Sequence, residues 1–289
     1  MKLTIFTPTY NRAELIPRVY ESISRQITND VEWLIVDDGS TDDTDKIVGE
    51  LIQKATFPIV YVKKENGGKH TAHNFALQHA RGEWFMCLDS DDMLSDGAIE
   101  NVFSAFSECS GKICAVAAYK RDIEGNLLCA KFENTDAVCG IYSLLKKYSG
   151  EYVFLFQTEV IKKYPYPVIN GERFSSECIL YDRLELEGYT VKPLDKVVQE
   201  CEYQSEGLSL GYKRLLKNNP CGVQMFYSQR ILLAETFKER FISCIKYCAF
   251  RILGKFKAPK HIGAGSLLIL PAYPLGALAT VYYLIRLGG

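Results

Sequence analysis

The sequence lacks the patterns that would mark a zinc protein or a disulfide-stapled domain. Its ten cysteines are scattered, without a Cys-x-x-Cys pair, and Cys244 and Cys248 are the closest two. We therefore interpret them as reduced, mostly buried thiols. His70 and His73 have the i, i+3 spacing of two ligands on one helical turn, but no acidic third ligand accompanies them in sequence. This pattern does not predict a zinc site.

Targeting segments, repeats and low-complexity stretches are also missing. The start, MKLTIFTPTYN, enters a strand pattern without the apolar region of a signal peptide. We therefore expect the catalytic body to be cytosolic.

The composition is that of a folded protein with an uneven charge distribution. Of the 289 residues 47% are hydrophobic and 24% charged, which is typical of an ordinary folded protein and does not favour disorder. The formal charge of −1 hides an asymmetry, because residues 211–261 hold eleven Lys and Arg against two acidic residues. An acidic body joined to a basic tail favours attraction to an anionic surface, which we expect to be a membrane and not a nucleic acid.

Short apolar runs alternate with amphipathic stretches along the first part of the chain. The runs at 3–7, 33–36, 59–62, 84–88 and 113–118 predict strands, and helices are predicted over 14–25, 43–53, 71–80 and 96–108. This order predicts an α/β fold, a Rossmann-like, mostly parallel sheet with helices on both faces. The alternation weakens after residue 125, where 153–157 and 197–203 indicate strands and 176–187 a helix.

Polar clusters follow four of the predicted strands. They are TPTYNR, DDGSTDD, ENGGKH and DSDD, one after each successive strand. Ligands of such sheets bind beyond the carboxyl ends of the strands, so four polar loops on one edge indicate a binding site.

The DSDD cluster is a candidate metal site. In an extended segment Asp89 and Asp91 would point to one side while Ser90 faces away. Hard carboxylate oxygens suit Mg²⁺ or Mn²⁺, and Mg²⁺ is commonly held by one or two carboxylates plus substrate phosphates. The alternative is a solvated turn before the next helix.

Two further clusters fit a nucleotide diphosphate. Gly67, Gly68 and Lys69 precede a predicted helix and offer amide donors and a cation to an anion, although a simple Gly-Gly turn is the alternative. Asp38 ends the second strand, where a carboxylate can accept from a base N–H or a ribose hydroxyl. One strand over, a backbone carbonyl and an aromatic face could frame a base, and the candidates there are Thr7, Pro8, Tyr10 and Arg12.

Taken together, TPTYNR, EWLIVDDGSTDDT, NGGKHTAHNFAL, ARGEW and LDSDD closely resemble the N-terminal half of family-2 glycosyltransferases with the GT-A fold. The resemblance covers about residues 1–125. It implies transfer of a sugar from a nucleotide-sugar, usually a UDP-sugar, with inversion at the anomeric carbon. It also implies that Asp38 reads the uracil, that Lys69 lies near the base and phosphates, and that the Asp89–Asp91 segment, with Ser90, serves ribose, metal and diphosphate.

An inverting transfer needs a general base, which the family usually supplies from a Glu-Asp pair at a helix start. Here GERFSSECILYDRL offers Glu177 followed by a cysteine. Related capsule-type transferases resemble this chain in a Phe-x-x-Glu context, so Glu177 is the predicted base, with Asp182 and Glu172 in reserve. The alternative is that Glu177 only favours a helix N-terminus.

The C-terminal part predicts a membrane-associating region. Apolar residues recur at helical spacing from 233 to 256, flanked by basic residues, and 262–285 contains no charge. That run is long enough to cross a bilayer, yet Pro271 and Pro274 predict a break near its middle and hence a shallow or re-entrant hairpin. A soluble core hairpin is the alternative.

These features predict residues 1–210 as the GT-A domain, with 1–125 binding the nucleotide-sugar and 126–210 facing the acceptor, and 211–289 as the basic helical region. The predicted function is a membrane-associated, metal-dependent inverting glycosyltransferase on the cytoplasmic side. It would extend a glycan or a polyprenyl-diphosphate-linked acceptor. A sugar nucleotidyltransferase would need a glycine-rich loop after the first strand, which TPTYNR is not, and a non-catalytic nucleotide-sugar-binding protein is the other alternative.

Overall fold

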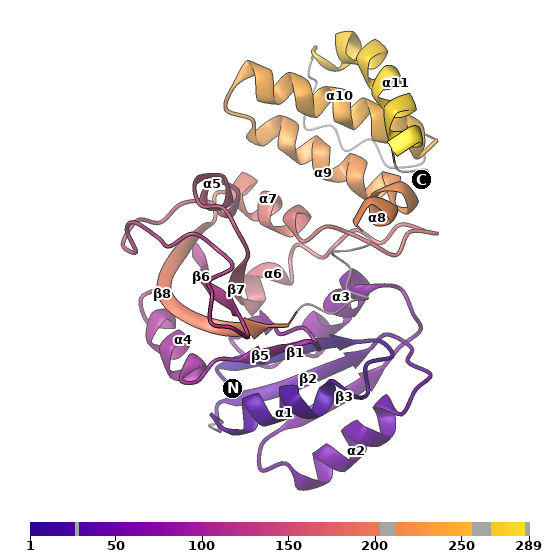
Figure 1. Cartoon of the computed structure of the whole chain (residues 1–289). Helices are drawn as coiled ribbons and strands as arrows, with labels where there is room; N and C mark the ends of the chain where they lie inside the picture. The colour runs from indigo at the N-terminus through magenta and orange to yellow at the C-terminus, as the bar shows by residue number, and fades with distance from the viewer. Residues whose placement is uncertain (27–28, 203–211, 256–266, 287–289) are drawn as a thin grey trace. The chain divides into compact units, whose positions relative to one another are not determined.

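The computed structural model describes residues 1–26, 29–202, 212–255 and 267–286, and these form two compact units (Figure 1). The first unit comprises residues 1–165 and 188–204. The second comprises residues 166–187 and 205–289. The helix start that carries Glu177 therefore belongs to the unit of the C-terminal helices.

The first unit is built on one sheet of eight strands in the order β3-β2-β1-β4-β7-β6-β8-β5. Strands β3, β2, β1 and β4 are parallel, β7 runs antiparallel to β4 and β6, and β8 is parallel to β6. The parallel half confirms the sheet expected from the βα alternation. The strands are β1 Leu3–Thr9, β2 Val31–Asp37, β3 Ile59–Lys63, β4 Trp84–Cys87, β5 Asp92–Leu94, β6 Ile113–Asp122, β7 Tyr152–Gln157 and β8 Thr190–Cys201.

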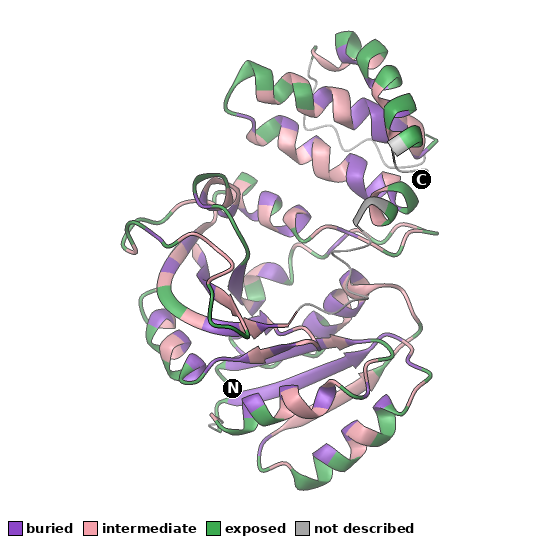
Figure 2. Ribbon diagram, viewed as in Figure 1, coloured by how far each residue is buried: buried purple, intermediate pink, exposed green. Residues whose placement is uncertain are grey.

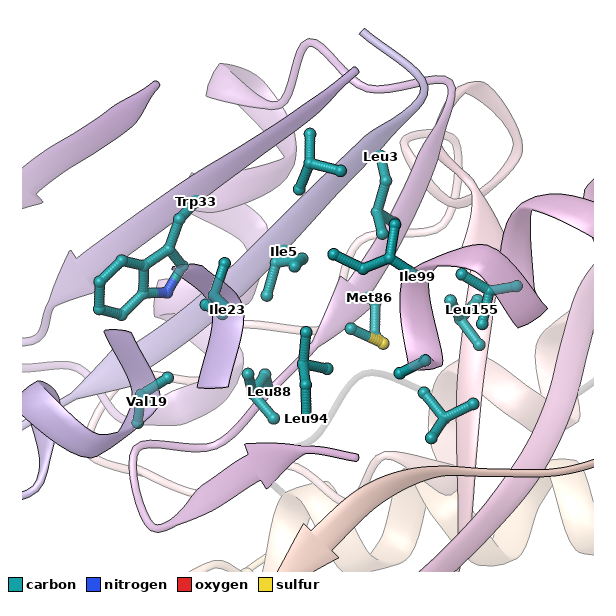
Figure 3. Packing of buried hydrophobic residues seen from close by; sticks show 14 of the residues in the cluster. Leu3, Ile5, Val19, Ile23, Trp33, Met86, Leu88, Leu94, Ile99 and Leu155 are labelled. Atoms are coloured by element: carbon teal, nitrogen blue, oxygen red, sulfur yellow. The ribbon is translucent and has the colours of Figure 1, made fainter. Parts of the chain in front are cut away.

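The core of this unit lies between the sheet and its helices. Figure 3 shows Ile5 of β1 and Trp33 of β2 close to Val19 and Ile23 of α1, all of them fully buried. Burial of such side chains stabilises each by about 1.5–3 kcal/mol relative to exposure, which fixes the sheet that carries the polar loops. The helices of the unit are α1 Ile16–Ser24, α2 Thr44–Lys54, α3 Lys69–His79, α4 Ala98–Phe106, α5 Ile141–Lys147 and α6 Thr158–Ile161.

The second unit is helical in its described residues. The Thr236 side chain accepts from the N–H of Glu239, whose carboxylate accepts from the N–H of Thr236, a capping box that starts α10. A small core of Ile231, Cys244, Tyr247, Cys248 and Ala272 joins α9, α10 and α11. The helices are α7 Cys178–Leu186, α8 Tyr212–Asn218, α9 Pro220–Leu233, α10 Phe237–Leu253 and α11 Ile269–Arg286.

The prolines of the uncharged run do not break it, so the hairpin expected there is wrong for the described residues. Ile269–Arg286 is one helix with Pro274 inside it. Pro271 lies in the first turn, where backbone N–H groups lack intrahelical partners anyway. Pro274 removes one hydrogen bond, and the contacts of α11 with α10 compensate. Among the described residues, no helix has the length and apolar content that crossing a membrane requires.

All ten cysteines are free thiols in this structure; five are buried and five only partly buried, whereas most were expected to be buried.

Candidate functional site

The DSDD segment forms a turn at the end of β4. The N–H of Asp92 donates to the carbonyl of Asp89 at 3.0 Å. The extended geometry expected for Asp89 and Asp91 is therefore wrong. The chain must change direction here, because β5 begins at Asp92 and pairs with β8 instead of continuing β4. Ser90 within the turn is buried.

Each aspartate of the turn is paired with its own cation. Lys69 lies 2.8 Å from Asp89, Arg12 lies 2.9 Å from Asp91, and Lys120 lies 3.3 Å from Asp92. The three cations come from different elements: the start of α3, the loop after β1, and β6. Three carboxylates in four residues would repel one another, and these cations offset that repulsion.

The two ends of the turn differ electrostatically. Asp92 is buried, and burial raises its pKa to about 6, against Lys120, which lowers it, while the charges of Asp89 and Asp91 add to the rise. At Asp89 burial also acts to raise the pKa, but Lys69 and Lys120 outweigh it and lower the pKa. Asp89 therefore stays ionised at neutral pH and can ligate a cation.

Two residues that the sequence did not reveal hold the turn in place. Arg18 donates to the carbonyl of Asp91 at 2.7 Å, and Gln199 donates to the carbonyl of Cys87 at 2.7 Å. Gln199 lies on β8, far from the motif in sequence, and its side chain is buried. No sequence signal distinguishes either residue from ordinary helix or strand positions.

Asp38 organises the glycine loop before α3. Its carboxylate accepts from the N–H groups of Gly67 at 3.0 Å and Gly68 at 2.7 Å and from Lys64 at 2.6 Å. These amides, expected to hold a phosphate, thus hold the protein's own carboxylate. A carboxylate has about four acceptor positions, so three bonds leave one for a further donor.

The loop after β1 is tied to the loop after β2. Asn11 adopts a positive φ of 51°, a conformation that asparagine tolerates. Its N–H donates to Ser40 and its side chain accepts from the N–H of Thr41. Next to it, the Tyr10 side chain is 48% exposed, so its ring is available to a planar ligand. The loop therefore presents an aromatic face at the carboxyl edge of the sheet.

The remaining residues predicted in this loop differ in accessibility. Thr7 is fully buried and its hydroxyl accepts from the Trp33 indole at 2.9 Å, so only its backbone can serve a ligand. Pro8 is partly buried, and Arg12 holds Asp91.

The turn at residues 89–92, here called the acidic turn, fits a divalent cation that takes its remaining ligands from a substrate. Among the described residues no three His, Cys, Asp or Glu side chains gather into a metal-binding group. Asp89 and Asp91 nevertheless supply two hard oxygen ligands, and their side chains are 32% and 24% exposed. Mg²⁺ is typically bound in this way, by one or two carboxylates plus phosphate oxygens. The ligation would displace Lys69 and Arg12 from the aspartates.

The three carboxylates considered for the general base lie in the second unit and differ in environment. Glu172 accepts from the N–H groups of Cys221 and Gly222 at the start of α9. Asp182 is fully buried beside Arg230 at 2.7 Å. Glu177 stands at the N-terminus of α7, is exposed, and accepts from the Tyr181 hydroxyl at 3.2 Å. Of the three, Glu177 is the most exposed, Glu172 is partly buried and Asp182 is fully buried.

The buried carboxyl group of Asp182 is expected to make the stability of the folded chain depend on pH. Burial raises its pKa to about 7, against the lowering effect of Arg230. The pKa of Asp182 is higher in the folded state, so the folded state binds this proton more tightly than the unfolded state does. The stabilisation that the proton gives the folded state is complete below pH 4 and is lost as the pH rises through 7. We expect the free energy of unfolding to fall by about 2–3 kcal/mol between pH 5 and 8.

Urea unfolding of the wild type and Asp182→Asn at several pH values would measure this dependence. The variant is expected to be less stable overall, because Arg230 loses its partner, but to show a flatter pH profile. An unchanged slope in the variant would assign the pH dependence to other groups.

The family comparison matches the half of the chain that carries this geometry. The model of "Glycosyl transferase family 2" matches residues 4–152, just over half of the chain. A relative from Campylobacter jejuni, GalNAc(5)-diNAcBac-PP-undecaprenol beta-1,3-glucosyltransferase, is 28% identical over 232 residues, covering 75% of this chain and 73% of its own. The chain spans only 13%, 23% and 50% of the length of three other curated relatives, among them the minor teichoic acid biosynthesis protein GgaB of Bacillus subtilis.

Solved structures share the fold. Residues 1–349 of S. aureus TarS in complex with UDP-GlcNAc superpose with a TM-score of 0.61 at 17% identity, covering 98% of this chain and 81% of that one. The mannosyltransferase PcManGT of Pyrobaculum calidifontis, in complex with GDP-Man and Mn²⁺, gives a TM-score of 0.58 at 19% identity, with coverage of 99% and 86%. At these identities the likeness shows the fold alone, and it agrees with the predicted GT-A architecture.

Proposed function

Because the chain belongs to glycosyl transferase family 2, we propose that it transfers a sugar from a UDP-sugar to a glycan or a polyprenyl-diphosphate-linked acceptor, with inversion at the anomeric carbon. The observation that carries this proposal is the convergence of the acidic turn, Asp38 and the Tyr10 loop at the carboxyl edge of the parallel strands. The binding of UDP-GlcNAc by TarS supports the choice of donor.

On the donor side, the base binds between Tyr10 and Asp38. The exposed Tyr10 ring stacks on the uracil, and the remaining acceptor position of Asp38 takes the N–H of the base. Lys69 and Arg12, which now pair with Asp89 and Asp91, would then pair with the diphosphate instead. Both basic side chains and both carboxylates would then still have a partner of opposite charge.

Asp89 and Asp91 would hold Mg²⁺ or Mn²⁺, with the diphosphate of the donor supplying further oxygen ligands. When bound, the cation acts as a Lewis acid that neutralises the charge of the departing diphosphate. The GDP-Man and Mn²⁺ in the PcManGT structure support this use of a metal. The chain's own contribution is to keep the Asp89 carboxylate ionised and to anchor the turn through Arg18 and Gln199.

Glu177 acts as the general base. The acceptor hydroxyl oxygen forms a bond to the anomeric carbon, the bond from that carbon to the diphosphate oxygen breaks, and Glu177 takes the hydroxyl proton. The nucleophile attacks opposite the leaving group, so the configuration inverts. The exposed position of Glu177 supports this role, since Glu172 and Asp182 are engaged in holding α9 and Arg230.

A lipid-linked acceptor would confine the reaction to a membrane surface. The name of the Campylobacter jejuni relative specifies an undecaprenol-linked acceptor, and this supports a lipid-linked glycan as the substrate here. The protein would then work in surface polysaccharide biosynthesis, peripheral or monotopic on the cytoplasmic side of the plasma membrane.

Incubation with a panel of UDP-sugars, Mn²⁺ and a polyprenyl-diphosphate-linked sugar tests the proposal. We expect release of UDP and a glycosylated lipid whose anomeric proton, by NMR, reports a β linkage from an α-linked donor. Retained configuration would contradict the mechanism. Binding of UDP-sugars without hydrolysis or transfer to any acceptor would favour the non-catalytic binding protein.

A further inference from the structure

The solvent side of α11 consists of apolar residues. No charged residue occurs between Ile269 and Ile285, and Figure 2 shows most of the helix exposed. Leu270, Leu278 and Ile285 are 76%, 68% and 74% exposed. An exposed apolar surface of this extent on a folded protein marks a contact site for a partner or a membrane. The exposed apolar residues, here called the α11 face, are Leu270, Pro271, Pro274, Leu275, Ala277, Leu278, Val281, Tyr282, Leu284 and Ile285.

The opposite side of α11 is fixed against α10. Ala272 is fully buried, and a Cβ added to Gly276 would lie 2.5 Å from the Cβ of Cys248. The Thr280 hydroxyl lies 3.3 Å from the carbonyl of Ala249 and 2.9 Å from that of Gly276. Small residues at i, i+4 and i+8 thus bring the two helices close together. The α11 face cannot rotate inward without losing these contacts.

The basic excess that precedes α11 in the sequence favours an anionic lipid surface over a second copy of the chain. Residues 211–261 hold eleven Lys and Arg against two acidic residues. On α10, Lys238 and Arg240 are exposed, and Lys246 is partly exposed with its ammonium 5.2 Å from the centre of the Tyr227 ring. Two copies with this excess would repel each other, whereas each basic residue near anionic lipid contributes about 1 kcal/mol of attraction.

We propose that the α11 face docks on an anionic phospholipid bilayer. The helix lies along the interface, with Leu278, Val281 and Ile285 entering the boundary between headgroups and acyl chains. It stays packed on α10 through Gly276 and Thr280. Interfacial helices typically bury their apolar side about 5–10 Å deep. This inference rests on the second unit alone and does not depend on the proposed transfer reaction.

Flotation of the full chain with vesicles tests the proposal, using phosphatidylglycerol–phosphatidylcholine vesicles against phosphatidylcholine alone. We expect stronger binding to the anionic vesicles, weakening as salt rises. The double variant Leu278→Glu/Ile285→Glu should lower the partition coefficient by about 100-fold or more, since two large aliphatic side chains no longer insert.

Val168→Glu is the matched control. Val168 belongs to the same unit and is 67% exposed, but it lies outside α11. It should bind vesicles like the wild type. Circular dichroism melting of each variant, and of the milder Leu278→Gln, separates lost docking from lost folding.

Three results of the flotation experiment would overturn the proposal. They are failure of the wild type to bind anionic vesicles at low salt, unchanged binding by the folded double variant, and equal loss in Val168→Glu. A concentration-dependent dimer by light scattering that the double variant dissociates, without vesicle binding, would also overturn it and assign the α11 face to a second copy. UDP binding, measured separately, bears on the transfer reaction and not on docking.

Discussion

Glu177→Gln is expected to lower kcat for sugar transfer by about 10²–10⁴ while UDP affinity stays at the wild-type value. Glutamine keeps the size of the side chain and its contact with the Tyr181 hydroxyl but cannot take the proton of the acceptor. The residues proposed to bind the donor, Asp38 and Asp89 among them, belong to the other unit of the chain. Calorimetry with UDP and a transfer assay on one preparation would separate binding from chemistry.

Glu187→Gln provides the matched control for this experiment. Glu187 is exposed at the opposite end of α7 and pairs with Arg183 at 3.1 Å. Its substitution should leave turnover unchanged. Near-normal turnover in Glu177→Gln would place the base elsewhere. Glu172→Gln would then need a stability measurement as well, because Glu172 accepts from two N–H groups at the start of α9 and its loss should also lower the melting temperature.

The parallel half of the sheet could be predicted because its strands are short, largely apolar runs. β1 and β2 are buried along nearly their whole length, so their sequences carry a clear signal. β5 has only three residues, too few to show any period. β8 extends from Thr190 to Cys201 with Pro193 and the exposed Asp195 and Lys196 inside it, so only its end was recognisable.

The site could be predicted as a set of loops but not as a set of contacts. Strand ends bring Asp38, Lys69 and Asp89 to one edge of the sheet, and that follows from the parallel topology. The pairings do not follow, because Lys120 reaches Asp92 across 28 positions and Gln199 reaches Cys87 across 112. These contacts depend on how β6 and β8 pack in the sheet, and the sequence around Asp89 does not determine that packing.

In the C-terminal region the positions of proline did not predict where the helix ends. Pro271 and Pro274 predicted a break, yet Ile269–Arg286 is one helix. The intrinsic cost of an interior proline is about 3 kcal/mol. Packing of Ala272 and Gly276 against α10 offsets that cost, and such tertiary contacts cannot be seen in the sequence of α11 alone.

Asp91→Asn is expected to abolish the metal-dependent part of UDP binding and to lower kcat/KM by about 10³. The variant removes one of the two carboxylates proposed to hold the metal, and hence part of the stabilisation, several kcal/mol, that the metal would give the departing diphosphate. Asparagine keeps the shape of the side chain, and the backbone carbonyl of residue 91 still accepts from Arg18. Arg12 loses its partner but is partly exposed, so solvent compensates and the fold persists.

Asp96→Asn is the control for charge, because Asp96 is an exposed aspartate five positions further along the chain. Both variants lower the local negative charge by one, so a general electrostatic effect would appear in both. Titration of UDP with Mn²⁺ and with a chelator gives the metal-dependent increment for each. We expect that increment to vanish in Asp91→Asn and to persist in Asp96→Asn, since a diphosphate-bound cation needs a carboxylate at the turn itself. An undiminished increment in Asp91→Asn would remove Asp91 from the metal site and leave its carboxylate only the ion pair with Arg12.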